Sequence, residues 1–505
     1  MKNAPALMGL DVGTTGVKAV VFGPDGEVRG KGFREYGILC DEPAKAEQDA
    51  DEVWRLTTEA LREAVIASGI SKAAAIGLSV QGDAIIAVGP GFTPLSPALL
   101  GMDYRPAAIA EECSKRFGAK KLFALTGMRP HPMNSIVKTL WLKEHRPEIF
   151  KRAWKIVTYG DFILGKLGGE AVIDWTMASR TMAFDLQRRT WASDLLGSLD
   201  IDPNLLSRPE PSGVAVGALR RDVAGAIGLE PGTLLVTGGH DQTCAALGAG
   251  AVREGIGVLS AGTADVLSTA LAAPMLNDAM FAGYYPCYIH AASDLYFTFA
   301  LNHIGGILLR WYRDTFGGEE VRAAQAAGLD PYDVMVASIP DGPSPVMVLP
   351  HFNGSGNPTC DMNSRGAMVG LTLATTRGDM VKAILEGLAF ELRGNLDYWT
   401  AAGIDVRELR AVGGGAKAPR WLQIRADVMG RPVTTLKVRE AACLGAAILA
   451  GKAAGVYASL EEGVAATVRP DHVYEPSEDR LRAYNGRYAV YRDLYPSLKG
   501  VNGRL

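Results

Sequence analysis

Apolar and polar positions alternate along this chain in blocks that predict strands interleaved with helices. Residues 7–12 and 17–22 are apolar runs rich in β-branched side chains, and a Gly/Thr turn, 13–16, separates them. Two such runs joined by a short turn are typical of a β-hairpin. The Pro-Asp-Gly turn at 24–26 leads into another predicted strand over 27–36.

Helical periodicity begins after this strand. Residues 51–67 place apolar side chains three and four positions apart and carry acidic residues in the first turn, which predicts an amphipathic helix. Two later apolar runs are predicted as strands with polar ends: 74–80, which ends at Gln81-Gly82-Asp83, and 233–239, which ends at His240-Asp241-Gln242 and leads into a helix over 243–250.

The second half of the chain repeats the opening layout. Residues 255–270 form an apolar run, a Gly/Thr turn and a second apolar run, like residues 7–22. One repeated hairpin is weak evidence for an internal repeat, and two unrelated hairpins are the alternative. The last third alternates again, with predicted helices at 377–396, 419–429 and 441–450 and strands at 409–412 and 432–435. This alternation predicts α/β domains with ligands at the strand ends and a boundary near residue 250.

Composition narrows the class of protein. The 505 residues are 48% hydrophobic and 21% charged, which is typical of a globular protein of several domains. A net charge of −3 gives no reason to expect a nucleic-acid partner, and no apolar run is long enough to cross a membrane. Six scattered cysteines without a C-x-x-C pair, and a first segment unlike a secretory signal, predict a cytoplasmic protein.

The polar residues at the strand ends match the needs of phosphoryl transfer. That reaction needs N–H groups around phosphates, a cation on the oxygens and a base aimed at the acceptor hydroxyl. The turn Gly13–Gly16 suits phosphate because glycine lets it approach the backbone, and Asp11 beside it can hold Mg²⁺. Gly262-Thr263 can form a second phosphate clamp, and Asp241 is a candidate general base.

Each feature also has a simpler interpretation. The first turn can be a plain hairpin, Asp241 can cap the helix that follows it, and Gly413–Gly415 can be a tight turn. His240 alone is more often a packed histidine than a catalytic one. No G-x-x-x-x-G-K-[ST] loop is present, so a nucleotide would be held in another way. It is the combination of features that favours phosphoryl transfer.

In this order the motifs resemble those of the FGGY carbohydrate kinases, of the actin/hexokinase/Hsp70-like ATPase superfamily. The resemblance covers about residues 7 to 455. GAMVGLTLATTRGDMVKAILEGLAF, Gly366–Phe390, fits the family's C-terminal signature. MNSIVKTLWLKEH, Met133–His145, fits the N-terminal signature except at Thr139, where an apolar residue is usual.

The resemblance implies a fold, a reaction and a set of site residues. The fold is α/β, with two ribonuclease H-like (actin-like ATPase) domains, residues 1–250 and 251–505, and a cleft between them. The reaction is ATP-dependent phosphorylation of a primary hydroxyl of a small sugar or polyol, with Mg²⁺ as cofactor and a ketopentose such as xylulose or ribulose as the favoured substrate. Asp241 is the implied base, and Asp11 is the implied Mg²⁺ residue, which binds the ion through water. The implied ATP and phosphate residues are Gly13, Thr14, Thr15, Gly262, Thr263, Gly413, Gly414, Gly415 and Ala416, and the implied sugar contacts are Gln81, Asp83, Asp103, Arg105 and Asp241.

Several positions depart from the family's pattern and leave the substrate open. Gly101 stands where the family often has Trp, and Lys417 stands where Asn is frequent in the adenosine loop. Gln81-Gly82-Asp83 replaces the Gln-Met-His of xylulokinases and the Arg-Glu of glycerol kinases. A ketohexose, a tetritol, a sugar acid and glycerol are therefore alternative substrates.

Two other functions compete with a kinase. Gly413-x-Gly415-x-x-Ala418 fits a nicotinamide dehydrogenase, which leaves Asp11 and Gly262-Thr263 without a role. A non-catalytic ATP- or sugar-binding regulator on the same fold has no use for Asp241. A homodimer is expected only because dimers are common. The sequence assigns no role to three histidines, namely His240, His303 and His351.

Overall fold

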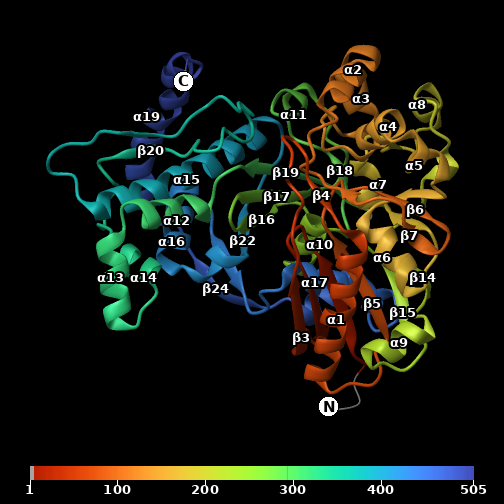
Figure 1. The fold of residues 1–505 in the computed structure, drawn as a ribbon. Coiled ribbons are helices and arrows are strands. Elements are labelled where there is room, and N and C mark those ends of the chain that lie inside the picture. The colour runs from red at the N-terminus through yellow and green to blue at the C-terminus, as the bar shows by residue number, and fades with distance from the viewer. Residues whose placement is uncertain (1–4, 293, 505) are drawn as a thin grey trace.

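Two mixed β-sheets organise the chain, one in each of two lobes (Figure 1). The computed structural model describes residues 5–292 and 294–504. The N-lobe sheet contains β1 (Leu7–Val12), β2 (Gly16–Phe22), β3 (Val28–Glu35), β5 (Ala75–Val80), β14 (Ala215–Ala218) and β15 (Leu234–His240). The C-lobe sheet contains β16 (Ile256–Ala261), β17 (Asp265–Leu271), β18 (Tyr288–Ile289), β19 (Tyr296–Asn302), β22 (Glu408–Val412), β23 (Val433–Leu436) and β24 (Pro470–Tyr474).

The two sheets share one topology. In the N-lobe, β1, β2 and β3 form an antiparallel meander, β5 and β15 continue from β1 in parallel, and β14 closes the edge antiparallel. In the C-lobe, β16, β17 and β19 form the meander, β22 and β23 continue in parallel, and β24 closes the edge. The predicted repeat is thereby confirmed, because both hairpins occupy the same place in their sheets. The α/β class is confirmed as well.

Helices cover both sheets and account for most of the remaining chain. They are α1 (Ala50–Ser68), α2 (Ala107–Phe117), α3 (Ala119–Thr126), α4 (Ser135–His145), α5 (Pro147–Arg152), α6 (Tyr159–Leu167), α7 (Trp175–Arg180), α8 (Ser193–Ser198), α9 (Arg221–Ile227), α10 (Asp241–Gly248), α11 (Asp278–Ala282), α12 (Gly306–Thr315), α13 (Gly318–Ala327), α14 (Pro331–Ala337), α15 (Arg377–Ala401), α16 (Pro419–Met429), α17 (Ala441–Ala453), α18 (Leu460–Thr467) and α19 (Glu478–Asn502). Short strands form small separate sheets: β4 (Glu47–Gln48), β6 (Ile86–Gly89), β7 (Thr93–Pro94), β8 (Ala98–Leu99), β9 (Lys155–Val157), β10 (Val172–Asp174), β11 (Phe184–Asp185), β12 (Thr190–Trp191), β13 (Arg208–Glu210), β20 (Met347–Leu349) and β21 (Ala367–Val369). None of the helices in the described residues combines the length and the apolarity that a membrane crossing requires.

The predicted helices form where local signals place them. The Asp49 side chain caps α1 by accepting from the N–H groups of Asp51 and Glu52, and Gly69 ends the helix in a left-handed conformation. Thr376 and Asp379 form a capping box at the start of α15, which runs five residues past its predicted end.

Helix α17 belongs to the C-lobe by sequence and to the N-lobe by packing. It follows β23, yet its backbone lies directly on the N-lobe sheet. A Cβ atom on Gly9 of β1 would lie 1.8 Å from the carbonyl oxygen of Cys443, and one on Gly77 of β5 would lie 2.0 Å from that of Ala446. Glycine at these two positions is what permits the helix to approach.

Helices α10 and α17 cross each other at the centre of the molecule. A Cβ on Gly445 would lie 1.9 Å from the carbonyl oxygen of Cys244, and one on Gly248 would lie 1.9 Å from that of Ala441. These two helices follow equivalent strands, β15 and β23, of the repeated sheets. The crossing therefore joins the lobes through backbone contact.

The C-terminal helix α19 packs on α15 through tyrosines. The Tyr484 hydroxyl donates to Glu386 Oε1 (2.9 Å), and the Tyr491 hydroxyl donates to Glu391 Oε1 (2.5 Å). Glu386 is buried, and this burial raises its pKa to about 7.

Candidate active site

The turn between β1 and β2 is fixed through its carbonyl groups. The N–H of Gly13 donates to the Gly16 carbonyl (2.9 Å), which closes the turn. The Gly13 carbonyl accepts from the Tyr36 hydroxyl (2.6 Å), and the Thr14 carbonyl accepts from the Gln48 amide (2.5 Å). Within the described part of the chain, the N–H groups of Thr14 and Thr15 donate to no other group. The turn thus keeps backbone donors available, as a phosphate cradle requires.

Asp11 is the acidic residue of this turn. It lies on β1 between Lys18 of β2 and Ser79 of β5. The Ser79 hydroxyl donates to Asp11 Oδ1 (2.6 Å), and burial raises the pKa of Asp11 against the opposing effects of Ser79 and Lys18. The Ser79 hydroxyl occupies only one of the acceptor positions of the Asp11 carboxylate, so its other lone pairs can accept further ligands. Carboxylate oxygen is a ligand that Mg²⁺ prefers. Asp11 therefore fits a magnesium site.

The equivalent turn of the C-lobe is bound to the start of α12. The N–H of Gly262 donates to the Ala264 carbonyl (3.1 Å) and closes the turn. The N–H groups of Gly306 and Ile307 donate to the carbonyls of Gly262 (2.9 Å) and Thr263 (3.3 Å). The turn therefore has a fixed position beside the positive end of a helix dipole.

The glycine run after β22 lies against this second turn. Gly413 has φ +84°, and a Cβ on it would lie 2.8 Å from the carbonyl oxygen of Ala261, the last residue of β16. A Cβ on Gly415 would lie 2.7 Å from the Cβ of Ala261. Residues 414–417 then form a 3₁₀ turn before α16. The predicted adenosine and second phosphate motifs are thus in backbone contact.

Asp241 is the first residue of α10, and it does not cap that helix. No side-chain capping bond is present at this end, and Asp241 Oδ1 lies 3.1 Å from His240 Nε2. The Asp241 side chain is 33% exposed. Burial raises its pKa to about 7, with the charges of Asp11 and Asp83 acting in the same direction and that of Arg180 opposing them. A carboxylate with a pKa near neutrality suits a general base.

A buried ion pair beside Asp241 was not found by the sequence analysis. Arg180, at the end of α7, contacts the Asp83 carboxylate, and both side chains are 2% exposed. The guanidinium lies 5.1 Å from the ring centroid of Tyr288, whose hydroxyl lies 3.0 Å from His240 Nδ1. Burial and the charge of Arg180 lower the pKa of His240 well below its usual value, so this histidine is neutral. The only sequence signal is that Arg180 is the single charged residue in the run 175–184.

Asp83 is held from the other side by α4. Its φ is +66°, a left-handed conformation that aspartate tolerates better than most residues. The Asp83 carbonyl accepts from the Ser135 hydroxyl (3.2 Å) and from Lys138 Nζ (3.3 Å). A Cβ on Gly101 would lie 3.2 Å from the carbonyl oxygen of Gly82, so glycine at position 101 packs closely against this segment.

Asp103 and Arg105 bind each other. Asp103 is fully buried and accepts from the side chain of Arg105 (2.6 to 3.1 Å) and from the N–H of Ala46 (3.1 Å). Arg105 also donates to Glu47 (2.7 Å) and lies 4.3 Å from the ring centroid of Trp141.

Gln81 donates to the carbonyl of Gly13 (3.2 Å), which places it next to the first phosphate turn. The roles of Gln81, Asp103 and Arg105 in sugar binding remain predictions.

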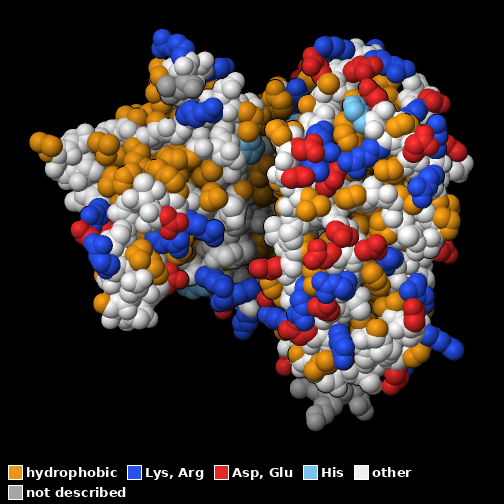
Figure 2. Space-filling model, in the orientation of Figure 1, with side chains coloured by type: hydrophobic (Ala, Val, Ile, Leu, Met, Phe, Trp, Pro, Cys, Tyr) orange, Lys and Arg blue, Asp and Glu red, His pale blue; other side chains and the backbone are white. Residues whose placement is uncertain are grey.

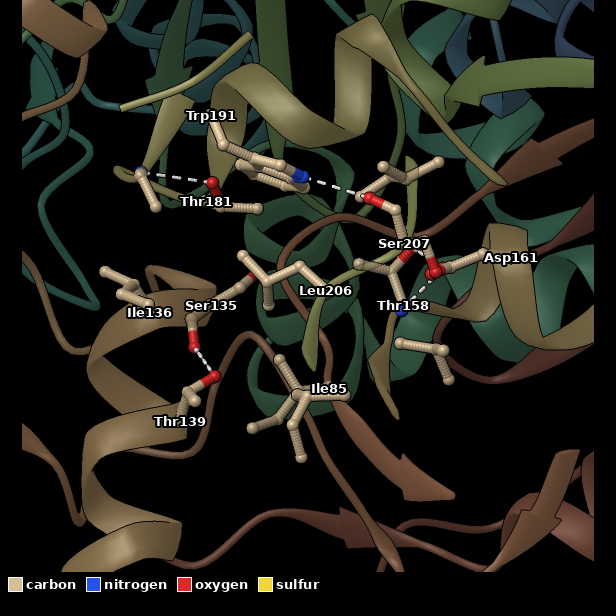
Figure 3. Close-up of a pocket in the computed structure, with 14 residues that line it drawn as sticks. Ile85, Ser135, Ile136, Thr139, Thr158, Asp161, Thr181, Trp191, Leu206 and Ser207 are labelled. Carbon is tan, nitrogen blue, oxygen red and sulfur yellow. Dashed lines mark hydrogen bonds between the residues drawn. The ribbon is translucent and has the colours of Figure 1, made fainter. Parts of the chain in front are cut away.

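The cavity in Figure 3 is not the sugar site. It has a volume of about 20 Å³, room for about one water molecule, and lies behind α4 and β9. Asp161 accepts there from the N–H and hydroxyl of Thr158 (both 2.6 Å) and from the Ser207 hydroxyl (2.5 Å), as the dashed lines show. One of its lining residues, Ser135, donates to the Asp83 carbonyl. The open space lies instead in the groove between the lobes in Figure 2.

His303 and His351, to which the sequence assigns no role, both lie in the C-lobe but have different neighbours. His303 Nδ1, at the end of β19, lies 3.2 Å from the carbonyl oxygen of Asn353. His351 is buried in the C-lobe, where Nδ1 lies 2.7 Å from the Ser364 hydroxyl and Nε2 lies 3.3 Å from Glu391 Oε1. His351 therefore packs between a loop and α15.

Comparison with known proteins gives matches over both lobes. Residues 6–248 match the N-terminal domain of the FGGY family of carbohydrate kinases, and residues 257–454 match its C-terminal domain. The chain is 27% identical over 501 residues to a xylulose kinase of Bacillus subtilis (strain 168), which covers 99% of this chain and 98% of that protein. It is 27% identical over 494 residues to a gluconokinase of the same organism, with coverage of 97% and 95%.

A solved structure has the same fold. The ligand-bound xylulose kinase from Lactobacillus acidophilus superposes with a TM-score of 0.88 at 26% sequence identity, over 99% of each chain. The implied two-domain, actin-like ATPase fold is therefore confirmed. The relatives act on different substrates by name, so their names leave the substrate of this chain open.

Proposed function

The chain belongs to the FGGY family of carbohydrate kinases and is an ATP-dependent sugar kinase, and we propose that its substrate is a ketopentose. In this proposal the enzyme phosphorylates a primary hydroxyl of a sugar such as xylulose or ribulose. The observation that carries the site assignment is Asp241, a partly exposed carboxylate with a pKa of about 7 at the start of α10. Helix α10 contacts β17 of the C-lobe, so the proposed base stands where the lobes meet.

In the proposed mechanism the two Gly/Thr turns bind the phosphates and Asp241 acts as the base. The N–H groups of Thr14 and Thr15 in the first turn, and of Thr263 in the second turn, hold the phosphates of ATP from opposite lobes. Asp241 accepts the proton of the sugar hydroxyl while that oxygen bonds to the γ-phosphorus. The bond from this phosphorus to the bridging oxygen breaks, and ADP leaves with the electron pair. Proton transfer to a carboxylate suits a loose transition state, in which the hydroxyl loses its proton late.

Magnesium and the adenosine complete the proposed site. Asp11 would hold Mg²⁺ through water, and a bound ion would neutralise charge on the phosphate oxygens. Gly413, Gly414, Gly415 and Ala416 hold the adenosine. The contact of Gly413 and Gly415 with Ala261 supports this arrangement, because it brings the adenosine loop to the end of the strand that carries the second phosphate turn.

The sugar is proposed to bind on the N-lobe side. Gln81, Asp83, Asp103 and Arg105 line or support that wall, and Asp241 contacts the reacting hydroxyl. The xylulose kinases among the relatives support a ketopentose, whereas the gluconokinase supports a sugar acid as the alternative. We also propose a cytoplasmic location, on the cysteine pattern, and a homodimer, which light scattering would test.

The proposal is tested by ADP release with Mg-ATP across ketopentoses, ketohexoses, tetritols, gluconate and glycerol. We expect strong stimulation by one ketopentose. Asp241→Asn should lower kcat by about 10²- to 10⁴-fold with little change in KM, because the general base is lost. Asp493→Asn, an exposed site on α19, is the matched control. Turnover preserved in Asp241→Asn would overturn the assigned base, and stimulation by gluconate alone would overturn the ketopentose.

A further inference from the structure

An ion pair in the C-lobe is completely shielded from solvent. Asp265 is the first residue of β17, directly after the second phosphate turn, and Arg425 lies in the middle of α16. Arg425 Nη2 lies 2.5 Å from Asp265 Oδ2, and both side chains are 0% exposed. The partners are 160 residues apart in the chain. No sequence motif marks either of them.

This pair contributes little to the stability of the core, because both charges lose their hydration on burial. Asp265 Oδ1 and Arg425 Nε and Nη1 have no hydrogen-bond partner among the described residues. Burial raises the pKa of Asp265 and lowers that of Arg425 even though each faces an opposite charge, so the attraction does not repay the loss of hydration. Apolar side chains of similar volume commonly replace such pairs without loss of stability. A role in placing other groups explains the pair better.

The pair connects the two nucleotide motifs of the C-lobe. On one side, Asp265 Oδ1 would lie 3.0 Å from a Cβ on Gly305, and the N–H of the next residue, Gly306, bonds to the carbonyl of Gly262. On the other side, the Arg425 guanidinium stacks on Trp421 at 3.9 Å from the ring centroid. The Trp421 ring would lie 3.2 Å from a Cβ on Gly415. A continuous set of contacts thus runs from the second phosphate turn to the adenosine loop.

We propose that the Asp265–Arg425 pair is a positioning device that fixes the second phosphate turn relative to the adenosine loop, so that both bind one ATP molecule together. This inference rests on the proposed nucleotide site. Preorganisation of this kind raises affinity by removing the cost of ordering the loops when the ligand arrives. Neither side chain touches the nucleotide itself.

The test replaces both charges at once, because either single variant leaves a buried charge without its partner. The variant is Asp265→Leu/Arg425→Met, and the measurement is calorimetric titration with Mg-ADP in the absence of sugar. We expect the variant to keep a cooperative thermal transition and to bind Mg-ADP about tenfold or more weakly. In the sugar kinase assay, KM for ATP should rise by a similar factor while KM for the sugar stays unchanged.

A control on the same helix separates placement from general destabilisation. Asp427 is buried on α16 but faces the start of α19, where it accepts from the N–H of Ser477; it also accepts from Gln423 of its own helix. Asp427→Asn should lower the Tm and leave the Kd for Mg-ADP unchanged. A folded double variant with wild-type affinity for Mg-ADP would overturn the inference and leave the kinase proposal intact. A wild-type chain that binds Mg-ADP yet phosphorylates no sugar would overturn the kinase proposal and leave this inference intact.

Discussion

Gly445→Ala should weaken the molecule and its activity together, because it separates two helices that touch by backbone. The added Cβ would lie 1.9 Å from the carbonyl oxygen of Cys244 in α10. Carbon and oxygen do not approach closer than about 3 Å, so α10 and α17 must move apart by about 1 Å in a close-packed interior. Overpacking of this kind costs roughly 1–3 kcal/mol. For cooperative unfolding of all 505 residues, this lowers the Tm by roughly 1–3 °C.

The effect on activity follows from the place of Asp241. Cys244 is one helical turn after Asp241, so a displaced α10 carries the base with it. Misplacement by about 1 Å can cost up to about 10²-fold in rate. We therefore expect a lower kcat at temperatures where the variant is fully folded, with a smaller change in KM for ATP.

The assays are thermal unfolding and steady-state kinetics. The matched control is Gly486→Ala in α19, where a Cβ meets nothing within 4 Å. That substitution should stabilise the protein by up to about 1 kcal/mol, because alanine is the better helix former. If Gly445→Ala kept the wild-type Tm and kcat, the close crossing would not constrain α10 and the reasoning would be refuted.

Three further predictions follow from the site and the core. The value of kcat/KM should fall as the pH drops through about 7, because Asp241 must be deprotonated to act, and the pH profile measures this; a flat profile between pH 5.5 and 8 would contradict the role of Asp241. Burial raises the pKa of Glu386 to about 7, so its protonated form stabilises the folded protein. This contribution to the free energy of unfolding is complete below the unfolded pKa of about 4.5. It falls by about 1.4 kcal/mol per pH unit as the pH rises to 7. Glu386→Gln should therefore lose less Tm than the wild type between pH 5 and 7.5, and parallel curves would contradict the assignment. Gly101→Trp should raise KM for the sugar several-fold while KM for ATP stays constant, because the indole ring would crowd Gly82 and Asp83 of the proposed sugar wall. Gly101→Ala is the control for the contact of a Cβ alone, which would lie 3.2 Å from the Gly82 carbonyl, and equal changes in both KM values would argue against a sugar pocket at this position.

The elements that the sequence predicts are those with local causes. Both hairpins form as expected because apolar runs and Gly/Thr turns determine them within about 20 residues. The start of α15 is fixed by Thr376 and Asp379, three residues apart. Asp11 and Asp241 could be proposed as site residues for the same reason, since each stands at the end of a strand that the sequence predicts.

The features that the sequence does not predict depend on distant partners. Arg180 and Asp83 are 97 residues apart, and Arg425 and Asp265 are 160 apart, so no local pattern joins them. The helix at 441–450 was predicted, but its contact with the N-lobe was not. Helix α17 is apolar on every side, so its sequence gives no amphipathic face that would point to one neighbour.

The position of α17 also has a consequence for the order in which the lobes mature during synthesis. The strands of the N-lobe sheet leave the ribosome by residue 240, yet the helix that covers Gly9 and Gly77 ends at Ala453 of a 505-residue chain. A nascent N-lobe therefore carries an uncovered sheet face until most of the C-lobe has been translated. Domains usually fold in turn from the N-terminus, whereas here the first lobe must wait for the second. Translation pauses beyond residue 250 would therefore prolong the exposure of this face.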